Sequence, residues 1–342
     1  MAKRSFSLFA LGLGALALGT ALLIVAEWRH SQPAPRPAAP RPEVLTGAGP
    51  FFPLPSAMPL DARKVELGRN LFQDRRLSGD GSVSCASCHD LARGGVDRLA
   101  HSRGIGGREG AMNAPTVFNS GFNFRQFWDG RARTLEEQVD GPLHSDVEMG
   151  SNWPLVLLRL GADPAMVTAF GTLYPNGLQP ANVRDALATF ERSLVTPNSR
   201  FDRFLRGDSQ ALNAEEVAGY HLFQRTGCAS CHQGVNLGGN LYQKLGIAEE
   251  FFSLRGNVRP GDLGRYNQTQ REEDRHFFKV PTLRNVAATG PYLHDGSVGS
   301  LEEVVATMAR FQLGVRLDPV DLSRLVAFLR TLNGEYLGKT VE

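Results

Sequence analysis

Two short motifs of one type contain every cysteine in the chain. They are Cys85-Ala-Ser-Cys88-His89 and Cys228-Ala-Ser-Cys231-His232. This spacing is typical of c-type haem attachment, because both sulfurs reach the vinyl groups at one porphyrin edge while the next imidazole lies beneath the iron. The alternatives are buried disulfides, a dithiol redox pair, which needs no histidine, or structural zinc, which usually needs four ligands. We therefore predict two covalently bound haems, with His89 and His232 as axial ligands.

The sixth iron ligand of each haem decides between electron transfer and catalysis. A second strong ligand closes the iron, whereas an open position allows chemistry. For the second haem the candidate is Met308, which lies downstream of His232 and before the last predicted helix. Ser300-x-x-Glu303 is a capping box for the helix that leads to it. The alternative interpretation of Met308 is a methionine that fills the core.

No equivalent ligand is evident for the first haem. Between His89 and Trp128 the chain is rich in glycine from residue 94 to 110, which indicates a flexible loop that covers the haem. The stretch is not a dinucleotide-binding fingerprint, since it lacks the flanking strand and helix. His101 in this loop could ligate the iron, and the alternative is a solvated loop histidine.

Polar residues that suit peroxide chemistry follow this loop. An amide and a carboxylate, Gln138 and Glu148, come after Trp128. Near an open ferric haem, a carboxylate can take a proton from the iron-bound oxygen and return it to the leaving oxygen. The alternative for Glu148 is a surface carboxylate. His144 either lines the same pocket or lies on the surface.

The N-terminus predicts export of the folded part. Residues 5–26 carry no charge and follow Lys3 and Arg4. This run is longer than the 7–15 residues of a signal-peptide core, and about 20 residues suffice to cross a bilayer. We expect an anchor over residues 1–30, with the rest on the periplasmic side of the bacterial inner membrane. Cleavage after Ala15-Leu-Ala17, giving a soluble periplasmic protein, is the alternative.

The remaining composition indicates a mainly α-helical protein. Hydrophobic residues make up 42% of the chain and recur at helical spacing, and the Pro- and Ala-rich residues 31–50 indicate a linker. The formal net charge of +2, without a basic stripe of interleaved aromatics, argues against nucleic-acid binding.

An internal repeat indicates two haem domains in tandem. Gly68-x-x-Leu71-Phe72 precedes the first haem motif and Gly219-x-x-Leu222-Phe223 precedes the second. Such a small residue lets one helix cross closely over a later one, which for the second domain we expect over residues 318–332. We predict cytochrome-c-like domains over residues 51–208 and 209–342, joined by long irregular loops. Coincidental amphipathic helices are the alternative.

From about Pro53 to Leu332 the chain resembles the bacterial di-haem cytochrome c peroxidase family, including its MauG-like branch. Besides the two haem motifs, the resemblance rests on the following segments: Asn113-x-Pro115-Thr116, Phe127-Trp128-Asp129-Gly130-Arg131, Gly141-Pro142, Val147-Glu148-Met149, Pro281-x-Leu283-Arg284-Asn285-Val286 and Pro291-Tyr292-x-His294-x-Gly296.

The resemblance implies a role for each matching residue. His89 would hold the low-potential peroxidatic haem, with Gln138 and Glu148 on its distal side. Trp128 would lie between the haems as a stepping stone for electrons. His232 and Met308 would be the axial pair of the high-potential haem. The resemblance also implies a calcium ion between the haems, bound by Asn113, Thr289 and Pro291, whose oxygen donors suit this cation.

One departure from the family pattern concerns activation. Many members carry a loop histidine that blocks the peroxidatic iron until the other haem is reduced, and here Ile105 occupies that position. An aliphatic side chain cannot bind iron, so we expect the first haem to be five-coordinate at rest. His294 is expected to be a hydrogen-bonded structural residue, because His232 and Met308 already satisfy the second iron.

Three functions remain open at this point. The leading prediction is an oxidoreductase of the cytochrome c peroxidase type, which reduces hydrogen peroxide with electrons from a cytochrome c or a small copper protein (cupredoxin). The second is a MauG-like oxidase that modifies tryptophan or tyrosine of a partner protein. The third is a non-catalytic electron carrier whose first haem is closed by His101 or Met112. A homodimer is a further expectation from the family.

Overall fold

The computed structural model describes residues 50–342 and shows a mainly helical protein. We call the part around the motif Cys85–His89 the first lobe and the part around the motif Cys228–His232 the second lobe. Nearly all of the predicted anchor and linker, and the candidate cleavage site, lie outside the described residues. Within residues 50–342 no single helix has the length and apolar character needed to cross a membrane. Only a pair of helices, bent by 106° at residues 161–164, meets the criteria of length and composition when taken together.

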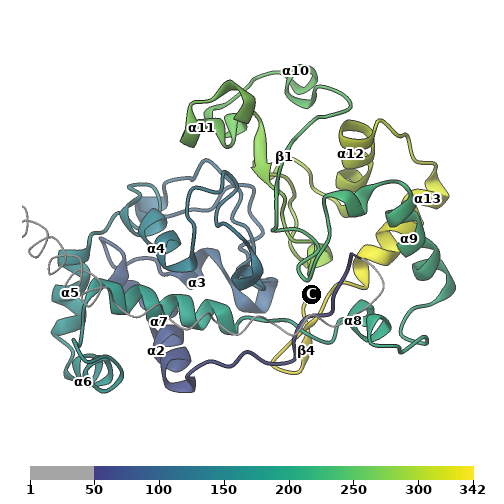
Figure 1. Ribbon diagram of the computed structural model, residues 1–342. Helices are drawn as coiled ribbons and strands as arrows, with labels where there is room; N and C mark the ends of the chain where they lie inside the picture. The colour runs from purple at the N-terminus through teal and green to yellow at the C-terminus, as the bar shows by residue number, and fades with distance from the viewer. Residues whose placement is uncertain (1–49) are drawn as a thin grey trace, which may run out of the picture. The chain divides into compact units, whose positions relative to one another are not determined.

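The α-helices account for most of the regular structure and connect through short 3₁₀ turns (Figure 1). The α-helices are α2 (Ala62–Gln73), α3 (Cys85–Cys88), α4 (Leu135–His144), α5 (Trp153–Gly161), α6 (Pro164–Leu173), α7 (Pro180–Ser193), α8 (Arg200–Leu205), α9 (Ala214–Arg225), α10 (Phe251–Arg255), α11 (Tyr266–Thr269), α12 (Leu301–Leu313) and α13 (Pro319–Arg330). The 3₁₀ helices are η1 (Arg75–Leu77), η2 (Leu91–Arg93), η3 (Ile105–Gly107), η4 (Ser120–Phe122), η5 (Cys228–Ser230), η6 (Pro260–Leu263), η7 (Glu272–Asp274) and η8 (Val286–Ala288).

In the first lobe, helix α2 crosses α7 at Gly68. A methyl group at this position would overlap the backbone carbonyl of Ala186 and the side chain of Phe190. The absence of a side chain therefore lets the two backbones approach closely. Around the crossing lies an apolar core that includes Leu71, Phe72 and Leu187.

The second lobe repeats this arrangement with α9 and α13. A methyl group at Gly219 of α9 would overlap the carbonyl of Arg324 in α13. The helix expected over residues 318–332 is observed as Pro319–Arg330, begins after the N-cap Asp318 and buries Leu325 and Leu329. The matching glycines thus perform the same packing role in both halves, as the repeat predicts.

Strands are few and short among the described residues. β1 (Tyr242–Lys244) pairs antiparallel with β2 (Phe277–Lys279), and Tyr242 lies opposite Lys279. β3 (Glu335–Tyr336) and β4 (Lys339–Thr340) form a hairpin near the C-terminus. The long connection between β1 and β2 contains α10 and α11, which lie together at the top of Figure 1.

The two ends of the described chain each pack against the other half. Phe51 bridges to Gly234 and lies in the second core, where its ring is 5.9 Å from that of Phe201. At the other end, Val341 belongs to the first core and the ring of Tyr336 lies 4.9 Å from Phe118. The division of the chain at residues 208 and 209 stays a prediction.

Two candidate haem sites

The first haem motif is held by backbone hydrogen bonds that fix its histidine. Cys85 and Cys88 begin and end α3, and the N–H of His89 donates to the carbonyl of Cys85 at 3.0 Å. Nδ1 of His89 lies 3.3 Å from the carbonyl oxygen of Gly95. This contact orients the ring and leaves Nε2 available to a metal, which is the usual arrangement of a ligating histidine.

The second motif has the same five residues and the same two histidine contacts, although Cys228–Ser230 forms a 3₁₀ turn where the first motif is α-helical. The N–H of His232 donates to Cys228 at 3.0 Å, and Nδ1 lies 3.3 Å from the carbonyl oxygen of Leu237. Burial lowers the pKa of His89 and lowers that of His232 to about 4. Both imidazoles are therefore neutral at pH 7, which is the form that binds iron.

The four thiols fit covalent haem attachment. None of the cysteines forms a disulfide, and burial raises the pKa of Cys85, Cys88 and Cys228. In each lobe the phenylalanine of the repeat lies beside the motif histidine: Phe72 is 6.5 Å from His89 and Phe223 is 6.5 Å from His232, between ring centroids. The two halves thus present equivalent sites for a porphyrin.

A largely apolar cavity in the second lobe contains the expected axial pair. His232 and Met308 both line it, together with Cys228 and Cys231. Met308 lies on α12, whose start is capped as predicted: the Glu303 N–H donates to the Ser300 hydroxyl at 3.2 Å, and the Ser300 N–H donates to the Glu303 carboxylate at 3.1 Å. An apolar cavity with paired thiols, imidazole and thioether on its walls suits a haem.

Glu148 is half-buried and lies against the glycine-rich loop that follows the first motif. Its carbonyl accepts from the N–H of Ile105, and a methyl group at Gly104 would overlap its backbone. Burial raises the pKa of Glu148, and the nearby Arg131 opposes this effect. The carboxyl is thus a better proton acceptor than an exposed one. The alternative of a surface carboxylate does not fit this burial.

Gln138 and Glu148 are brought to one region by the end of α4. Gln138 lies in this helix, and the N–H of Met149 returns to donate to the carbonyl of Pro142 at 3.1 Å. Between them, Gly141 makes room for the ring of Phe127, because a side chain at this glycine would overlap that ring. The segment of residues 127–131, which we call the WDGR loop, therefore packs against the same turn.

Ile105 occupies the loop position that packs against Glu148. The N–H of Ile105 donates to the carbonyl of Glu148 at 2.9 Å, and the Ile105 side chain lies against Gly150. His101 is not a solvated histidine, contrary to that alternative in the sequence analysis. Its Nδ1 lies 3.0 Å from Glu109, and its Nε2 is buried without a partner among residues 50–342.

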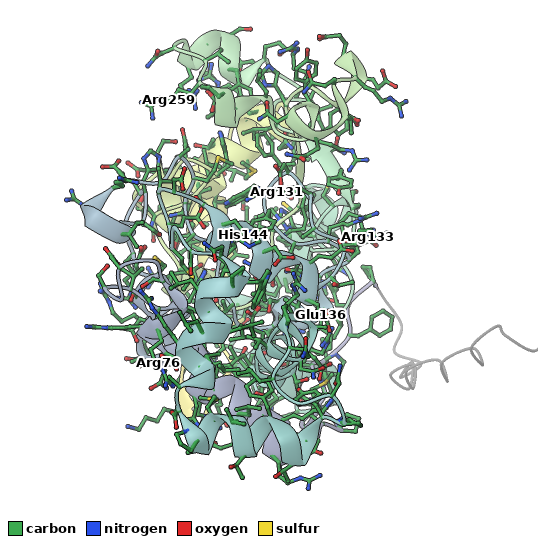
Figure 2. All side chains as sticks on the ribbon, turned by 90° about the vertical axis from the view of Figure 1, so that its left-hand side faces the viewer. Arg76, Arg131, Arg133, Glu136, His144 and Arg259 are labelled. Atoms are coloured by element: carbon green, nitrogen blue, oxygen red, sulfur yellow. The ribbon has the colours of Figure 1, made fainter. Side chains whose placement is uncertain are left out.

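His144 is a surface residue. It is exposed at the end of α4 and its ring lies 6.4 Å from that of Trp153, edge to face. Figure 2 labels it together with Arg131, from the WDGR loop, and Glu136, at the start of the same helix. Of the two interpretations of His144, the structure supports the surface one.

Trp128 is fixed by its own polar contacts and lines the cavity of the second lobe. Its Nε1–H donates to the carbonyl of Asn113 at 2.9 Å, and its carbonyl accepts from the Lys279 N–H at 2.8 Å. Asn113, Thr289 and Pro291 also line this cavity. The amide nitrogen of Asn113 donates to the carbonyl of Leu99 at 2.9 Å. This hydrogen bond does not involve the side-chain oxygen of Asn113.

Several buried polar residues lie beside the sites, and of these only His294 was expected from the sequence. His294 is a buried structural residue, as expected, and its Nε2 lies 2.6 Å from the carboxylate of Asp262. Arg255 pairs with both Asp262 and Asp295 and offsets one of their two negative charges. Lys279 and Glu191 are also buried. No spacing signal marks such residues, because their burial depends on contacts between distant segments.

Comparison with known proteins agrees with this geometry. The family described as di-haem cytochrome c peroxidase matches residues 62–210. The cytochrome c551 peroxidase of Pseudomonas aeruginosa is 42% identical over 83% of this chain and 84% of its own length. The chain belongs to the di-haem cytochrome c peroxidase family. It is accordingly a haem c protein and an oxidoreductase of the cytochrome c peroxidase type.

Two further relatives extend the comparison. The cytochrome c peroxidase Ccp of Escherichia coli K12 is 48% identical over 84% of this chain, which spans 62% of the length of that protein. A solved MauG-like protein associated with microbial copper homeostasis is 29% identical, with a TM-score of 0.73 over 87% of this chain and 96% of that protein. The di-haem peroxidase fold thus covers both lobes.

Proposed function

We propose that this protein reduces hydrogen peroxide to water at the first haem site with two electrons collected at the second. The observation that supports this most directly is the half-buried Glu148, hydrogen-bonded through its carbonyl to the loop that follows the first motif, in which Ile105 cannot bind iron. The overall reaction consumes one peroxide, two electrons and two protons and yields two waters.

Haem iron at the first site would bind peroxide and supply the oxidising chemistry. Glu148 would accept a proton from peroxide held at this site and return it to the oxygen that leaves as water. Burial raises the pKa of Glu148, which makes its carboxylate a stronger proton acceptor for the first half of this transfer. Gln138 supplies an amide that orients the substrate by hydrogen bonding. Peroxide turnover, measured with a reduced donor, tests this assignment.

Electrons would reach the molecule through the second site. A haem with one histidine and one methionine ligand has a high potential, which suits acceptance from a cytochrome c or a cupredoxin. Trp128 lines that cavity, and its neighbour Phe127 packs against Gly141 in the helix that carries Gln138, so we assign Trp128 the path between the sites. Loss of fast donor oxidation in Met308→Ala, with peroxide binding retained, is the expected result.

The first iron is expected to be open in the resting protein. The loop around Ile105 is docked on Glu148 and brings an aliphatic side chain to this position. Electron paramagnetic resonance of the ferric protein tests this point. A high-spin signal from the first haem supports it, and a fully low-spin, six-coordinate first haem contradicts it.

A calcium ion is proposed at the wall of the cavity in the second lobe. Asn113, Thr289 and Pro291 line this wall and offer the oxygen donors that calcium prefers. We expect chelation by EGTA to lower the rate of electron transfer between the haems, and added Ca²⁺ to restore it. An unchanged rate after verified removal of bound calcium would contradict this site.

A MauG-like oxidation of a partner protein is the second candidate. The similarity to a solved MauG-like protein and the aliphatic Ile105 favour it. The methionine at position 308 disfavours it, because MauG itself has a tyrosine in that place. Rapid consumption of a reduced donor with peroxide supports the peroxidase, and negligible donor turnover with a covalently altered partner supports the oxidase.

A non-catalytic carrier is the third candidate. It would need His101 or Met112 to close the first iron. The Nδ1 of His101 is held by Glu109 and its Nε2 has no partner among residues 50–342, so this contact does not argue against ligation. The side chain of Met112 lies against Gly261 and packs on the apolar cluster that contains Phe252 and Phe278. Rapid reaction of the ferric protein with peroxide would exclude this function.

Localisation and assembly stay proposals. We propose that the chain works on the periplasmic side of the inner membrane, attached through residues 1–30, with signal cleavage as the alternative. Intact-mass measurement of the mature protein distinguishes the two. A homodimer is expected from the family alone, and analytical ultracentrifugation tests it.

A further inference from the structure

Lys279 is a buried lysine at the wall of the second haem cavity. It ends strand β2, is 5% exposed and is among the residues that line the cavity with His232 and Met308. Its backbone is fixed by two neighbours, since its N–H donates to Trp128 and its strand pairs with Tyr242 opposite. The position of this residue at the cavity wall is therefore determined by the fold.

The amine of Lys279 has no acidic partner among residues 50–342. The other lysines with described ion pairs behave differently: Lys64 pairs with Asp185 at 2.7 Å and Lys244 with Glu250 at 2.8 Å. Burial without such a partner lowers the pKa of Lys279 to about 8. An unpaired buried ammonium is costly, so a partner from outside the chain is expected.

The cavity itself indicates the chemistry of that partner. Its walls are mostly apolar and include the thiols, imidazole and thioether that suit haem c. A haem carries two propionate carboxylates as its anionic groups. We propose that the ammonium of Lys279 binds a propionate of the second haem and that this pairing raises the reduction potential of that haem. The inference rests on haem c at the second motif.

The effect on potential follows from charge. A positive charge beside the haem favours the reduced iron, which carries one charge less than the oxidised iron. Because the site is shielded from water, the effect is screened less than at the surface. Lys279 is thus a positioning residue for the haem that accepts electrons, and its role is separate from proton transfer at Glu148.

Substitution of Lys279 by methionine tests the proposal. Lys279→Met keeps the length of the side chain and removes its charge. We expect both haems to attach and the midpoint potential of the second haem, measured by spectroelectrochemistry, to fall, while that of the first changes less. Lys244→Met is the matched control, since it removes the same charge from an exposed ion pair on the neighbouring strand. We expect no fall in that control.

Three results would overturn the proposal. These are an unchanged second-haem potential in Lys279→Met with Met308 still bound, a fall confined to the first haem, and an equal fall in Lys244→Met. Lys279→Arg should restore most of the potential, because guanidinium also pairs with carboxylate. Haem content and peroxide turnover are measured separately, so failure of the proposed peroxidase function stays distinguishable.

If the Lys279→Met variant does not take up its second haem, the proposal is tested on the wild-type protein instead. The chain has five lysines, so labelling lysine with ¹⁵N gives few ammonium signals. Pairing with a propionate raises the pKa of Lys279 above the value of about 8 that burial sets. We expect its ammonium signal in the reduced holoprotein to persist above pH 8. Deprotonation at or below pH 8 would overturn the proposal.

Discussion

The backbone N–H of Ile105 donates a hydrogen bond to the carbonyl of Glu148 at 2.9 Å. The loop that could block the first iron is therefore attached to the segment that carries the proposed proton acceptor. Because Ile105 packs its side chain against Gly150, the loop brings an aliphatic group, and no iron ligand, to this place.

We predict that Ile105→His closes the first iron. An imidazole at this position is a strong ligand, so the ferric first haem should change from high spin to low spin. Peroxide turnover of the resting enzyme should fall and return when the second haem is reduced first. Electron paramagnetic resonance and stopped-flow kinetics measure the two effects. Ile105→Leu is the control, and a high-spin histidine variant would contradict the prediction.

Glu148→Gln should lower peroxide turnover by roughly 10²–10⁴-fold, because it keeps the shape of the side chain and removes the proton acceptor. Steady-state kinetics with a reduced donor measure this. Asp146→Asn is a matched control two residues away, since Asp146 is exposed on the same turn and should tolerate the change. Equal rates for wild type and Glu148→Gln would refute the role of Glu148.

Gly68→Ala should destabilise the first lobe by roughly 1–3 kcal/mol or more, because the added methyl group overlaps the carbonyl of Ala186. Denaturant unfolding of the haem-loaded protein measures this. Gly171→Ala in helix α6 is the control, since nothing lies within 4 Å of the new methyl group. That variant should gain up to about 1 kcal/mol from helix propensity. Equal free energies of unfolding for the two variants would show that helices α2 and α7 do not cross closely at Gly68.

Glu191 should make stability depend on pH. Burial raises its pKa from 4.5 to about 8, and Arg192 partly opposes this. Between these values the folded protein holds a proton that the unfolded chain releases, so stability falls as pH rises through this window. Glu191→Gln should remove that fall, with a gain of at most about 5 kcal/mol at pH 8.

Urea unfolding of the haem-loaded protein at several pH values between 5 and 8 tests this effect. Glu137→Gln is the control, because Arg133 lowers the pKa of Glu137, which then does not titrate in this window. A stability of Glu191→Gln that runs parallel to that of the wild type across the window would disprove the assignment.

Local patterns in the sequence determined much of the site. The Cys-x-x-Cys-His motifs, the capping box of Ser300 and Glu303 and the repeated Gly68 and Gly219 each act within a turn or two of chain. Such features depend on spacing and side-chain type, which a sequence displays directly. The haem attachment motifs and the helix crossings could therefore be predicted.

Only the tertiary structure decided which charged groups lose contact with water. Nothing in the sequence distinguishes the buried Lys279 from the paired and more exposed Lys244, or Glu191 from the exposed Glu137. The packing of Phe51 in the second core likewise joins segments almost 200 residues apart. Burial is a property of the whole fold, since desolvation depends on every segment that covers a group.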